Sequence, residues 1–284
     1  MKILQGKKQN YSTKEIKQMI EKVNPEHPDK IADRIAGAIV DLVYERKENP
    51  RIAVEVLIGH GECKIIIEAN IGLHSGKIKE TVKRITKDKN INIDILQVSQ
   101  DEHLQMNQEE KKRCGDNGIF RGIPLTEEEK EISRIAKDIY REYPTDGKYI
   151  LDKGKLTVCQ SHCNHKFEAN NFGKDIKEVL TNPLGYWTGG PHVHTGATNR
   201  KLGSDMATSV TGGGLHGKDL SKADVTLNIY AFNKAQETGE IVEISCSIGD
   251  EEIDGKPYEE LVEEARQYIN NLGGFEKFAE WGLF

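Results

Sequence analysis

The chain has 284 residues and a mass of 31.9 kDa, so its length suits about two domains of average size or three small ones. Its 40 Lys and Arg against 46 Asp and Glu give a net charge of −6, which excludes the overall basic surface of a typical nucleic-acid-binding protein. Charged residues make up 30% of the chain and the mean hydropathy is −0.61, as expected of a soluble globular protein. The 27 glycines exceed the usual share of about 7%, so their positions are informative.

The N-terminal residues and the cysteines indicate the cellular compartment. The N-terminal region has no apolar run long enough for a signal peptide, and no window approaches the ~18 apolar residues of a membrane span. The cysteines are odd in number and sparse: Cys63, Cys114, Cys159, Cys163 and Cys246. We therefore expect a cytoplasmic protein with reduced thiols, and neither a membrane nor a nucleic acid as its partner.

The first third of the chain contains a strong helical pattern followed by strand patterns. Apolar residues at helical spacing predict a helix over 28–44, with Pro28 in its first turn and His27 near the N-cap. Strict apolar alternation predicts a strand over 51–59, and a second strand over 62–72 follows a glycine turn. A helix over 77–87 and a strand over 91–98 complete a first unit.

Two further units follow. Thr126 and its capping-box partner Glu129 predict a helix that runs to about residue 142, followed by strands over 148–151 and 155–160 and a short helix over 175–180. The last part predicts helices over 223–236 and 257–272, a strand over 241–248 between them, and a short tail over 275–284. This order predicts an α+β protein of three comparable units, each a small sheet with helices on one face, over 1–113, 114–190 and 191–284.

The motif His27-Pro28-Asp29-Lys30 begins the long helix. A helix N-terminus presents free N–H groups and a positive dipole end, and a His and a Lys add donors for an anion such as phosphate. An Asp beside them suits Mg²⁺, which takes carboxylate and phosphate oxygens together. By itself, the motif is more typical of an ordinary polar helix start.

A glycine-rich segment lies near residue 215. Gly212 to Lys218 has the G-x-x-x-x-G-K spacing of a nucleotide-triphosphatase phosphate loop, but Asp219 stands where Ser or Thr is required to hold Mg²⁺. We therefore reject that loop type and retain a glycine segment that leads into Lys218, Lys222 and Asp224. The pair Arg200-Lys201, which precedes this segment, suggests a polyphosphate clamp, although such pairs are usually only solvated.

A competing interpretation is a zinc-stabilised interaction module. Cys159, His162, Cys163 and His165 lie within seven residues, and thiolate and imidazole ligands suit zinc. The two cysteines lack C-x-x-C spacing, however, and the cluster begins inside a predicted strand. Buried cysteines and surface histidines are the simpler interpretation.

In their order along the chain, the motifs resemble those of methionine adenosyltransferases (S-adenosylmethionine synthetases). The resemblance covers about two hundred residues and is carried by His27-Pro28-Asp29-Lys30-Ile31, Gly115-Asp116-Asn117-Gly118, Asp146-Gly147-Lys148, Asn182-Pro183-x-Gly185, Gly189-Gly190-Pro191, Arg200-Lys201, and Gly212-Gly213-Gly214 with Gly217-Lys218-Asp219-x-x-Lys222-x-Asp224.

The resemblance implies three related α/β-sandwich domains about a pseudo-threefold axis. It also implies a homodimer or a dimer of dimers, with active sites at the subunit interface. The implied reaction makes S-adenosylmethionine from ATP and L-methionine: the methionine sulfur displaces triphosphate from C5′, and the triphosphate is then cleaved to phosphate and pyrophosphate. A neutral thioether needs no general base, so the enzyme must align the attack and neutralise the leaving group.

The resemblance also implies roles for individual residues. ATP and its triphosphate would contact His27, Lys30, Asp146, Lys148, Arg200, Lys201 and Lys218, with His27, Lys148, Arg200 and Lys218 as the catalytic residues and Tyr186 or Trp187 against adenine. Methionine would contact Glu68, Gln100, Asp116, Lys222 and His194. Asp29 and Asp224 would hold two Mg²⁺ ions, and Glu55 would hold K⁺.

The chain departs from the family pattern at several of these positions. Glu26 replaces the glycine before the HPD motif, His194 stands in place of an Asp, and Asn199 replaces the Gly before the Arg-Lys pair. Val225-Thr226 replace an Arg-Ser pair, and the chain is shorter than usual members. A catalytically degenerate homologue that acts as a nucleotide-binding regulatory partner is therefore the alternative to an active transferase.

Overall fold

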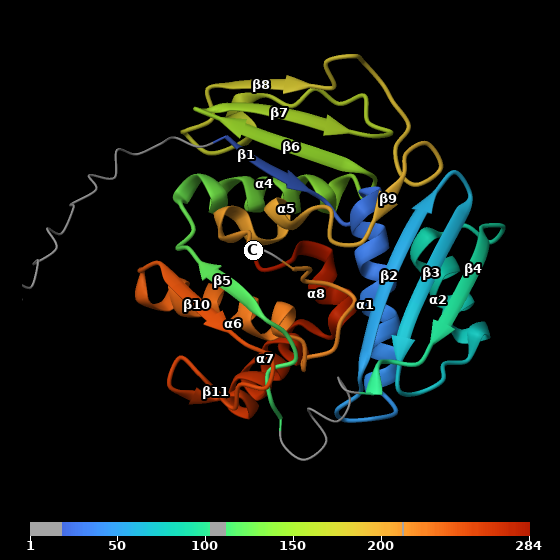
Figure 1. Ribbon diagram of the computed structural model, residues 1–284. Coiled ribbons are helices and arrows are strands. Elements are labelled where there is room, and N and C mark those ends of the chain that lie inside the picture. Colours follow the sequence, from blue (N-terminus) through green and yellow to red (C-terminus); the bar gives the residue numbers. More distant parts are fainter. Residues whose placement is uncertain (1–18, 103–111, 212) are drawn as a thin grey trace, which may run out of the picture.

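The computed structural model describes residues 19–102, 112–211 and 213–284, so Gly212 and the N-terminal segment considered above lie outside the described residues. Figure 1 shows three main sheets at the periphery of the molecule, with helices packed between them. The expected mixed α+β fold is confirmed.

The first sheet has the strand order β4-β3-β2-β9. Its strands are β2 (Ile52–Gly59), β3 (Glu62–Ala69), β4 (Asn92–Val98) and β9 (Gly196–Ala197). Helices α1 (Pro28–Tyr44) and α2 (Ser75–Thr86) lie against one face, where alternate strand residues such as Val54, Val56 and Ile65 are buried. The apolar alternation that predicted β2 therefore arises because helices cover one face of the sheet and leave the other face open.

The second sheet has the order β1-β6-β7-β8 and its own core. Its strands are β1 (Ile20–Val23), β6 (Gly147–Asp152), β7 (Lys155–Gln160) and β8 (Glu178–Thr181). Helix α4 (Glu127–Glu142) packs against it and begins with the predicted capping box between Thr126 and Glu129. A one-turn 3₁₀ segment, η1, covers Ala169–Asn171.

The predicted helix over 175–180 is wrong. The backbone N–H groups of Lys177 and Glu178 both donate to the carbonyl oxygen of Gly154, and residues 178–181 then pair with β7 in parallel as β8. Long-range pairing at the sheet edge overrides the local pattern, since a segment this short has little helical stability of its own.

The third sheet joins β5 (Gly118–Gly122) to β10 (Val242–Cys246). Helix α6 (Ala223–Thr238) packs closely on it, because Gly122 has no Cβ to meet the carbonyl of Ala231. The remaining elements are α5 (Leu202–Met206), η2 (Ala207–Ser209), the pair β11 (Glu252–Ile253) and β12 (Lys256–Pro257), α7 (Tyr258–Leu272) and α8 (Phe275–Trp281). Helix α8 lies against α1 near the centre of the molecule.

The three sheets exchange strands in a cycle. Strand β1, from the first predicted unit, pairs with β6 of the second. Strand β5, from the second unit, pairs with β10 of the third, and β9, from the third, pairs with β2 of the first. Each unit therefore completes its sheet with a strand from another one.

The helices and the cysteines bear on the expected class of protein. None of the helices in the described parts of the chain is long and apolar enough to cross a membrane. All five cysteines are free thiols, as the sequence analysis expects.

Candidate active site

The N-terminus of α1 presents a neutral histidine. His27 is the N-cap residue, and its Nδ1 accepts a hydrogen bond from the Asp29 backbone N–H at 3.2 Å. Burial, followed by the positive charge of Lys201, lowers the pKa of His27 to about 3. Because Nδ1 is an acceptor, the neutral ring carries its proton on Nε2, where it can donate to a bound anion.

Asp29 follows as a buried carboxylate with cationic partners. Its Oδ1 accepts from the Ala197 backbone N–H at 2.9 Å, and its Oδ2 lies 2.9 Å from the Lys201 ammonium. Burial alone would raise the pKa of Asp29, but Lys201 and the Ala197 N–H lower it below its ordinary value. The Arg200 guanidinium lies 3.7 Å from Oδ1, so the Arg-Lys pair predicted as a clamp lies at the HPD motif.

A tight contact brings the next residues to the same place. A Cβ on Gly196 would lie 2.1–2.5 Å from Pro28 and Asp29 backbone atoms, so only glycine lets β9 approach α1 this closely. Just before β9, the His194 ring lies edge-on to His27 with ring centroids 6.1 Å apart.

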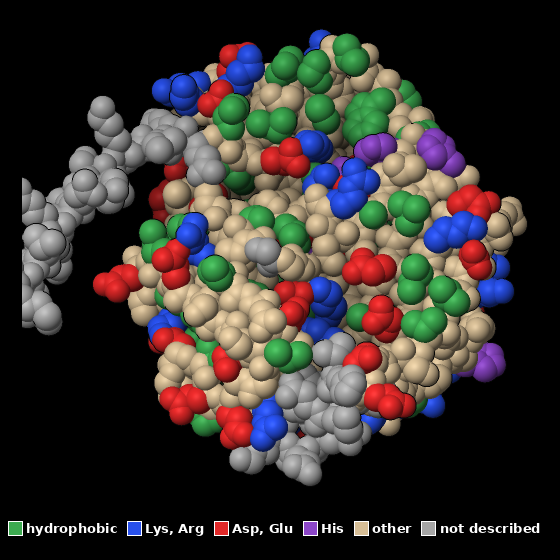
Figure 2. Space-filling model, in the orientation of Figure 1, with side chains coloured by type: hydrophobic (Ala, Val, Ile, Leu, Met, Phe, Trp, Pro, Cys, Tyr) green, Lys and Arg blue, Asp and Glu red, His purple; other side chains and the backbone are tan. Residues whose placement is uncertain are grey.

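The second sheet contributes two residues from the start of β6. Asp146 is buried and accepts from the Gly190 backbone N–H at 2.8 Å, and burial raises its pKa to about 6. The Lys148 ammonium pairs with Glu21 at 2.7 Å. Both Lys148 and His194 act electrostatically on His27, so the two sheets converge on one region. On the face drawn in Figure 2, Lys, Arg and His side chains lie together below the β6–β8 sheet.

The glycine segment forms the second half of the site. Gly217 has a φ of +80°, and a Cβ there would lie 2.3 Å from the Val54 carbonyl oxygen. The following residue, Lys218, forms an ion pair with Asp224 at the start of α6, and Lys222 pairs with Asp219 at 2.5 Å. The predicted cations and carboxylates of this segment therefore lie together.

Both halves of the site use the same edge of β2. Backbone bonds join Thr198 to Val56 and Gly217 to Val54, so the 196–198 and 217–219 segments follow one another along that edge. A cavity of about 330 Å³ is lined in part by Arg200, Lys201 and Glu21.

Two predicted residues lie on the open face of the first sheet. Glu55 and Glu68 are exposed there, and Glu55 accepts a hydrogen bond from the Thr198 hydroxyl. Ala53 is the cross-strand partner of Glu68 and also forms a bridge with Lys218. Directly opposed residues in antiparallel pairs share a face, so Glu68 and Lys218 belong to the same open surface.

The other predicted residues lie at separate points. Gln100 is buried just after β4, and Asp116 lies in the loop before β5. Trp187 donates from its indole nitrogen to Asn182 at 3.1 Å, whereas Tyr186 is exposed and contacts His162. Trp187 is the less exposed of the two aromatic candidates.

Lys30 lies in a different side-chain cluster from the histidine and the aspartate of the same motif. It is fully buried, and its ammonium bonds Asp33 at 3.2 Å and Asp205 at 2.5 Å. Burial alone would lower its pKa, but Asp205 and Asp33 raise it above the ordinary value. His216 completes this buried cluster. The sequence analysis missed Asp33, Asp205 and His216, because only the i, i+3 spacing of Lys30 and Asp33 leaves a local signal.

The cysteine–histidine cluster proposed as a zinc alternative has other contacts. Cys163 is buried, with its sulfur 4.0 Å from the His165 carbonyl, and His162 contacts the Tyr186 hydroxyl at 3.2 Å. Within the described part of the chain, the one group of three potential ligands close enough for a single ion is Asp33, Asp205 and His216. The zinc interpretation therefore gains no support.

The chain is similar to known proteins in both sequence and fold. Residues 16–108 match the family model of the S-adenosylmethionine synthetase N-terminal domain. S-adenosylmethionine synthases of Flavobacterium johnsoniae and Mycoplasma mycoides are 25% and 27% identical to the chain, each over 81% of it and over 74% and 76% of their own lengths. The chain is thus similar to S-adenosylmethionine synthases over most of its length.

The fold is similar over almost the whole molecule. A solved structure described as an unusual S-adenosylmethionine synthetase from Campylobacter jejuni matches with a TM-score of 0.70, covering 94% of each chain at 18% identity. The predicted S-adenosylmethionine synthetase fold is thereby confirmed.

Proposed function

We propose that this protein is an active methionine adenosyltransferase. The observation that carries the proposal is the convergence of His27, Asp29 and Lys201 with Lys148 at the N-terminus of α1. Neutral His27 would donate from Nε2 to the triphosphate, while Lys148, Arg200, Lys201 and Lys218 would bind its phosphate oxygens. In an acidic protein, these residues supply the local positive charge that such a leaving group requires.

The reaction needs alignment more than acid–base catalysis. The methionine sulfur would form a bond to C5′ of ATP as the C5′–oxygen bond to triphosphate breaks, leaving a sulfonium. The triphosphate would then be cleaved to phosphate and pyrophosphate.

The substrates would contact different parts of the site. Trp187 would stack on adenine, and Asp146 would lie against the nucleotide. Glu68 and Gln100 would contact methionine, and a cavity of about 380 Å³ at the ends of β3 and β4 is lined by apolar and amide groups such as Ile67 and Gln97. Asp116, Lys222 and His194 complete the proposed methionine contacts.

The residues present fit Mg²⁺. Asp29 and Asp224 supply hard carboxylate oxygens, and each is paired with a lysine in the structure. A Cβ on Gly213 would lie 2.0 Å from Asp224 Oδ1, so only glycine lets the backbone approach that carboxylate this closely. When bound, two Mg²⁺ ions held by these residues would neutralise part of the triphosphate charge. Glu55, with the Thr198 hydroxyl, offers oxygen ligands for K⁺.

A homodimer is part of the proposal. Four apolar side chains are exposed on the open face of the first sheet: Leu57, Ile66, Leu96 and Val98, each at least 42% exposed. Contiguous exposed apolar side chains are typical of a subunit interface. Because Glu68 and Lys218 share this face, a second copy packed there would complete the site, and a dimer of dimers is compatible with the same contact.

The decisive experiment is a product assay. The purified protein, with saturating ATP, methionine and Mg²⁺, should form S-adenosylmethionine, and His27→Ala or Asp29→Asn should lower the rate by about 10²-fold or more. His74→Ala is a matched control, since His74 is also a helix N-cap residue but makes no side-chain cap bond. ATP binding in calorimetry without product would instead favour the degenerate, regulatory homologue that His194 suggests.

A further inference from the structure

Asn199 joins the two cationic segments of the site. Its backbone is left-handed, with a φ of +60°, and its N–H donates to Asp33 Oδ1 at 2.8 Å. Its side-chain oxygen accepts from the His216 N–H at 2.8 Å, and its side-chain nitrogen donates to the His216 carbonyl at 3.1 Å. The Asn199 side-chain amide thus bonds both the N–H and the carbonyl of His216, which lies in the glycine segment.

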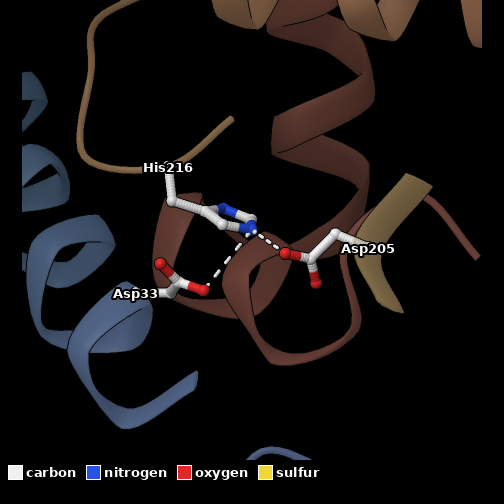
Figure 3. A group of neighbouring side chains, drawn as sticks. All are labelled: Asp33, Asp205 and His216. Atoms are coloured by element: carbon white, nitrogen blue, oxygen red, sulfur yellow. Dashed lines mark hydrogen bonds and ion pairs between the residues drawn. The ribbon is translucent and has the colours of Figure 1, made fainter. Parts of the chain in front are cut away.

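The contact is supported from inside the protein. The His216 ring nitrogen Nε2 lies 3.1 Å from Asp205 (Figure 3). The other carboxylate oxygen of Asp205 binds Lys30. Asp33 binds Lys30 and also the backbone of Asn199. Both segments are therefore held by the same buried cluster, which connects α1, α5 and the glycine segment.

This cluster is not an empty cation site. The ligand atoms of Asp33, Asp205 and His216 lie within 4.8 Å of one another. The Lys30 ammonium, however, is already within 3.3 Å of an atom of each. The buried negative charge has its counter-ion, so the cluster fits a supporting role rather than a metal-binding one.

We propose that Asn199 is a positioning residue that fixes Arg200-Lys201 relative to Lys218, so that both segments bind one polyphosphate. The inference rests on the proposed function for the identity of the anion. Arg200 and Lys201 follow Asn199 directly, and Lys218 lies two residues after His216. The family resemblance expects Gly at this position; Asn tolerates the left-handed backbone that Gly would supply and adds the two amide bonds.

The test removes the amide but keeps the backbone conformation. Asn199→Gly should weaken the binding of inorganic tripolyphosphate with Mg²⁺ by about tenfold in calorimetry, because two hydrogen bonds that align the segments are lost. It should raise the KM for ATP more than it lowers kcat. The His216 amide should exchange its hydrogen faster, while amides of β3 remain unchanged.

A matched control separates positioning from stability. Asp254 is also left-handed, at φ +54°, and its side chain binds the Tyr230 hydroxyl away from the proposed site. Asp254→Gly should lower the thermal midpoint without changing tripolyphosphate affinity. If Asn199→Gly behaves in the same way, Asn199 is merely structural and the inference is overturned.

A second variant guards against a misfolded Asn199→Gly protein. A Cβ on Gly214 would lie 2.5 Å from the Asn199 side-chain nitrogen, so Gly214→Ala should displace the amide and weaken tripolyphosphate binding similarly. Unchanged affinity in this variant contradicts the inference, as does a wild-type protein that fails to bind tripolyphosphate. If the wild type binds tripolyphosphate, is weakened by both variants and yet forms no product, the inference holds and the proposed transferase activity fails.

Discussion

His27 owes its chemical state to its neighbours. Its imidazole is buried at a helix N-terminus, among Lys201, Lys148 and His194, and these surroundings disfavour protonation. The sequence motif predicts that a His lies at this helix start, but it carries no information on the lysines. The neutral donor state depends on residues more than a hundred positions away, which is why sequence reasoning could place the residue and not its protonation.

Replacing His194 tests this electrostatic environment. His194→Asp adds a negative charge beside His27 and removes a group that disfavours its protonation, so the pKa of His27 should rise by about one unit. An NMR titration of the His27 ring would measure it. His192→Asp, on the same loop, is the control and should have a smaller effect. An unchanged His27 pKa in His194→Asp would contradict the electrostatic account.

Asp146 makes stability depend on pH in the opposite direction to an ordinary paired carboxylate. Its pKa of about 6 in the folded protein exceeds the unfolded value near 4, so the folded state binds the extra proton between these pH values. Stability contributed by this group is therefore lost as the pH rises from about 4 to about 6. Asp146→Asn keeps an acceptor for the Gly190 N–H and removes the buried charge.

We expect Asp146→Asn to be more stable than the wild type at pH 7, by up to about 3 kcal/mol, and similar to it at pH 4. Urea denaturation at the two pH values measures the difference. If the variant is no more stable than the wild type at pH 7, burial of the charged Asp146 carboxylate does not destabilise the folded protein. In the proposed transferase, the same variant should also change the affinity for ATP, since Asp146 would lie against the nucleotide.

At the scale of elements, the long and strongly periodic segments were predictable. Helices α1, α4, α6 and α7 and strands β2, β3, β4 and β7 lie within a few residues of their predicted ranges, because each has enough apolar repeats to identify its covered face. The four-residue strands β1 and β8 and the two-residue β9 were not predicted. Their structure comes from partners far away in the sequence, and no local pattern records that.

The contact between β9 and α1 offers a test at this scale. Gly196→Ala should destabilise the protein by about 1–3 kcal/mol, because the new methyl group overlaps the Pro28 backbone and forces the two elements apart. The displacement should also lower activity, since Arg200, Lys201 and His194 move with β9. Thermal denaturation and the product assay measure the two effects.

Gly203→Ala provides the comparison for that substitution. Gly203 lies in α5, and a Cβ there would meet nothing within 4 Å, so the midpoint should change little or rise. Equal destabilisation by both alanine substitutions would contradict the importance of the β9–α1 contact.

For the whole molecule, the open face of the first sheet predicts the assembly state. Leu57→Lys combined with Ile66→Lys places two charges among its exposed apolar side chains and should convert a dimer to a monomer in sedimentation experiments. Activity should fall with the dimer if the site is shared between subunits. Ile119→Lys on β5 is the control, because Ile119 is equally apolar and 66% exposed but lies on another sheet.

An unchanged sedimentation coefficient in the double variant would mean that the subunits associate elsewhere or not at all. The exposed face itself could be foreseen from the sequence, because the apolar residues at alternate positions of β2, such as Val54 and Val56, are separated by residues such as Glu55. Which face the helices cover, and which cations reach its edge, depends on the packing of all three sheets.

The cyclic exchange of β1, β5 and β9 has a consequence for how the chain is made. A nascent chain that has emerged from the ribosome only to residue 113 contains β2, β3 and β4 without their edge partner, and β1 without β6. The first sheet can gain its edge strand β9 only when Ala197 has been synthesised. The second sheet needs β1, which is synthesised long before its partner β6. Such non-local pairing delays native contacts, so the three units should be acquired together late in synthesis rather than one after another.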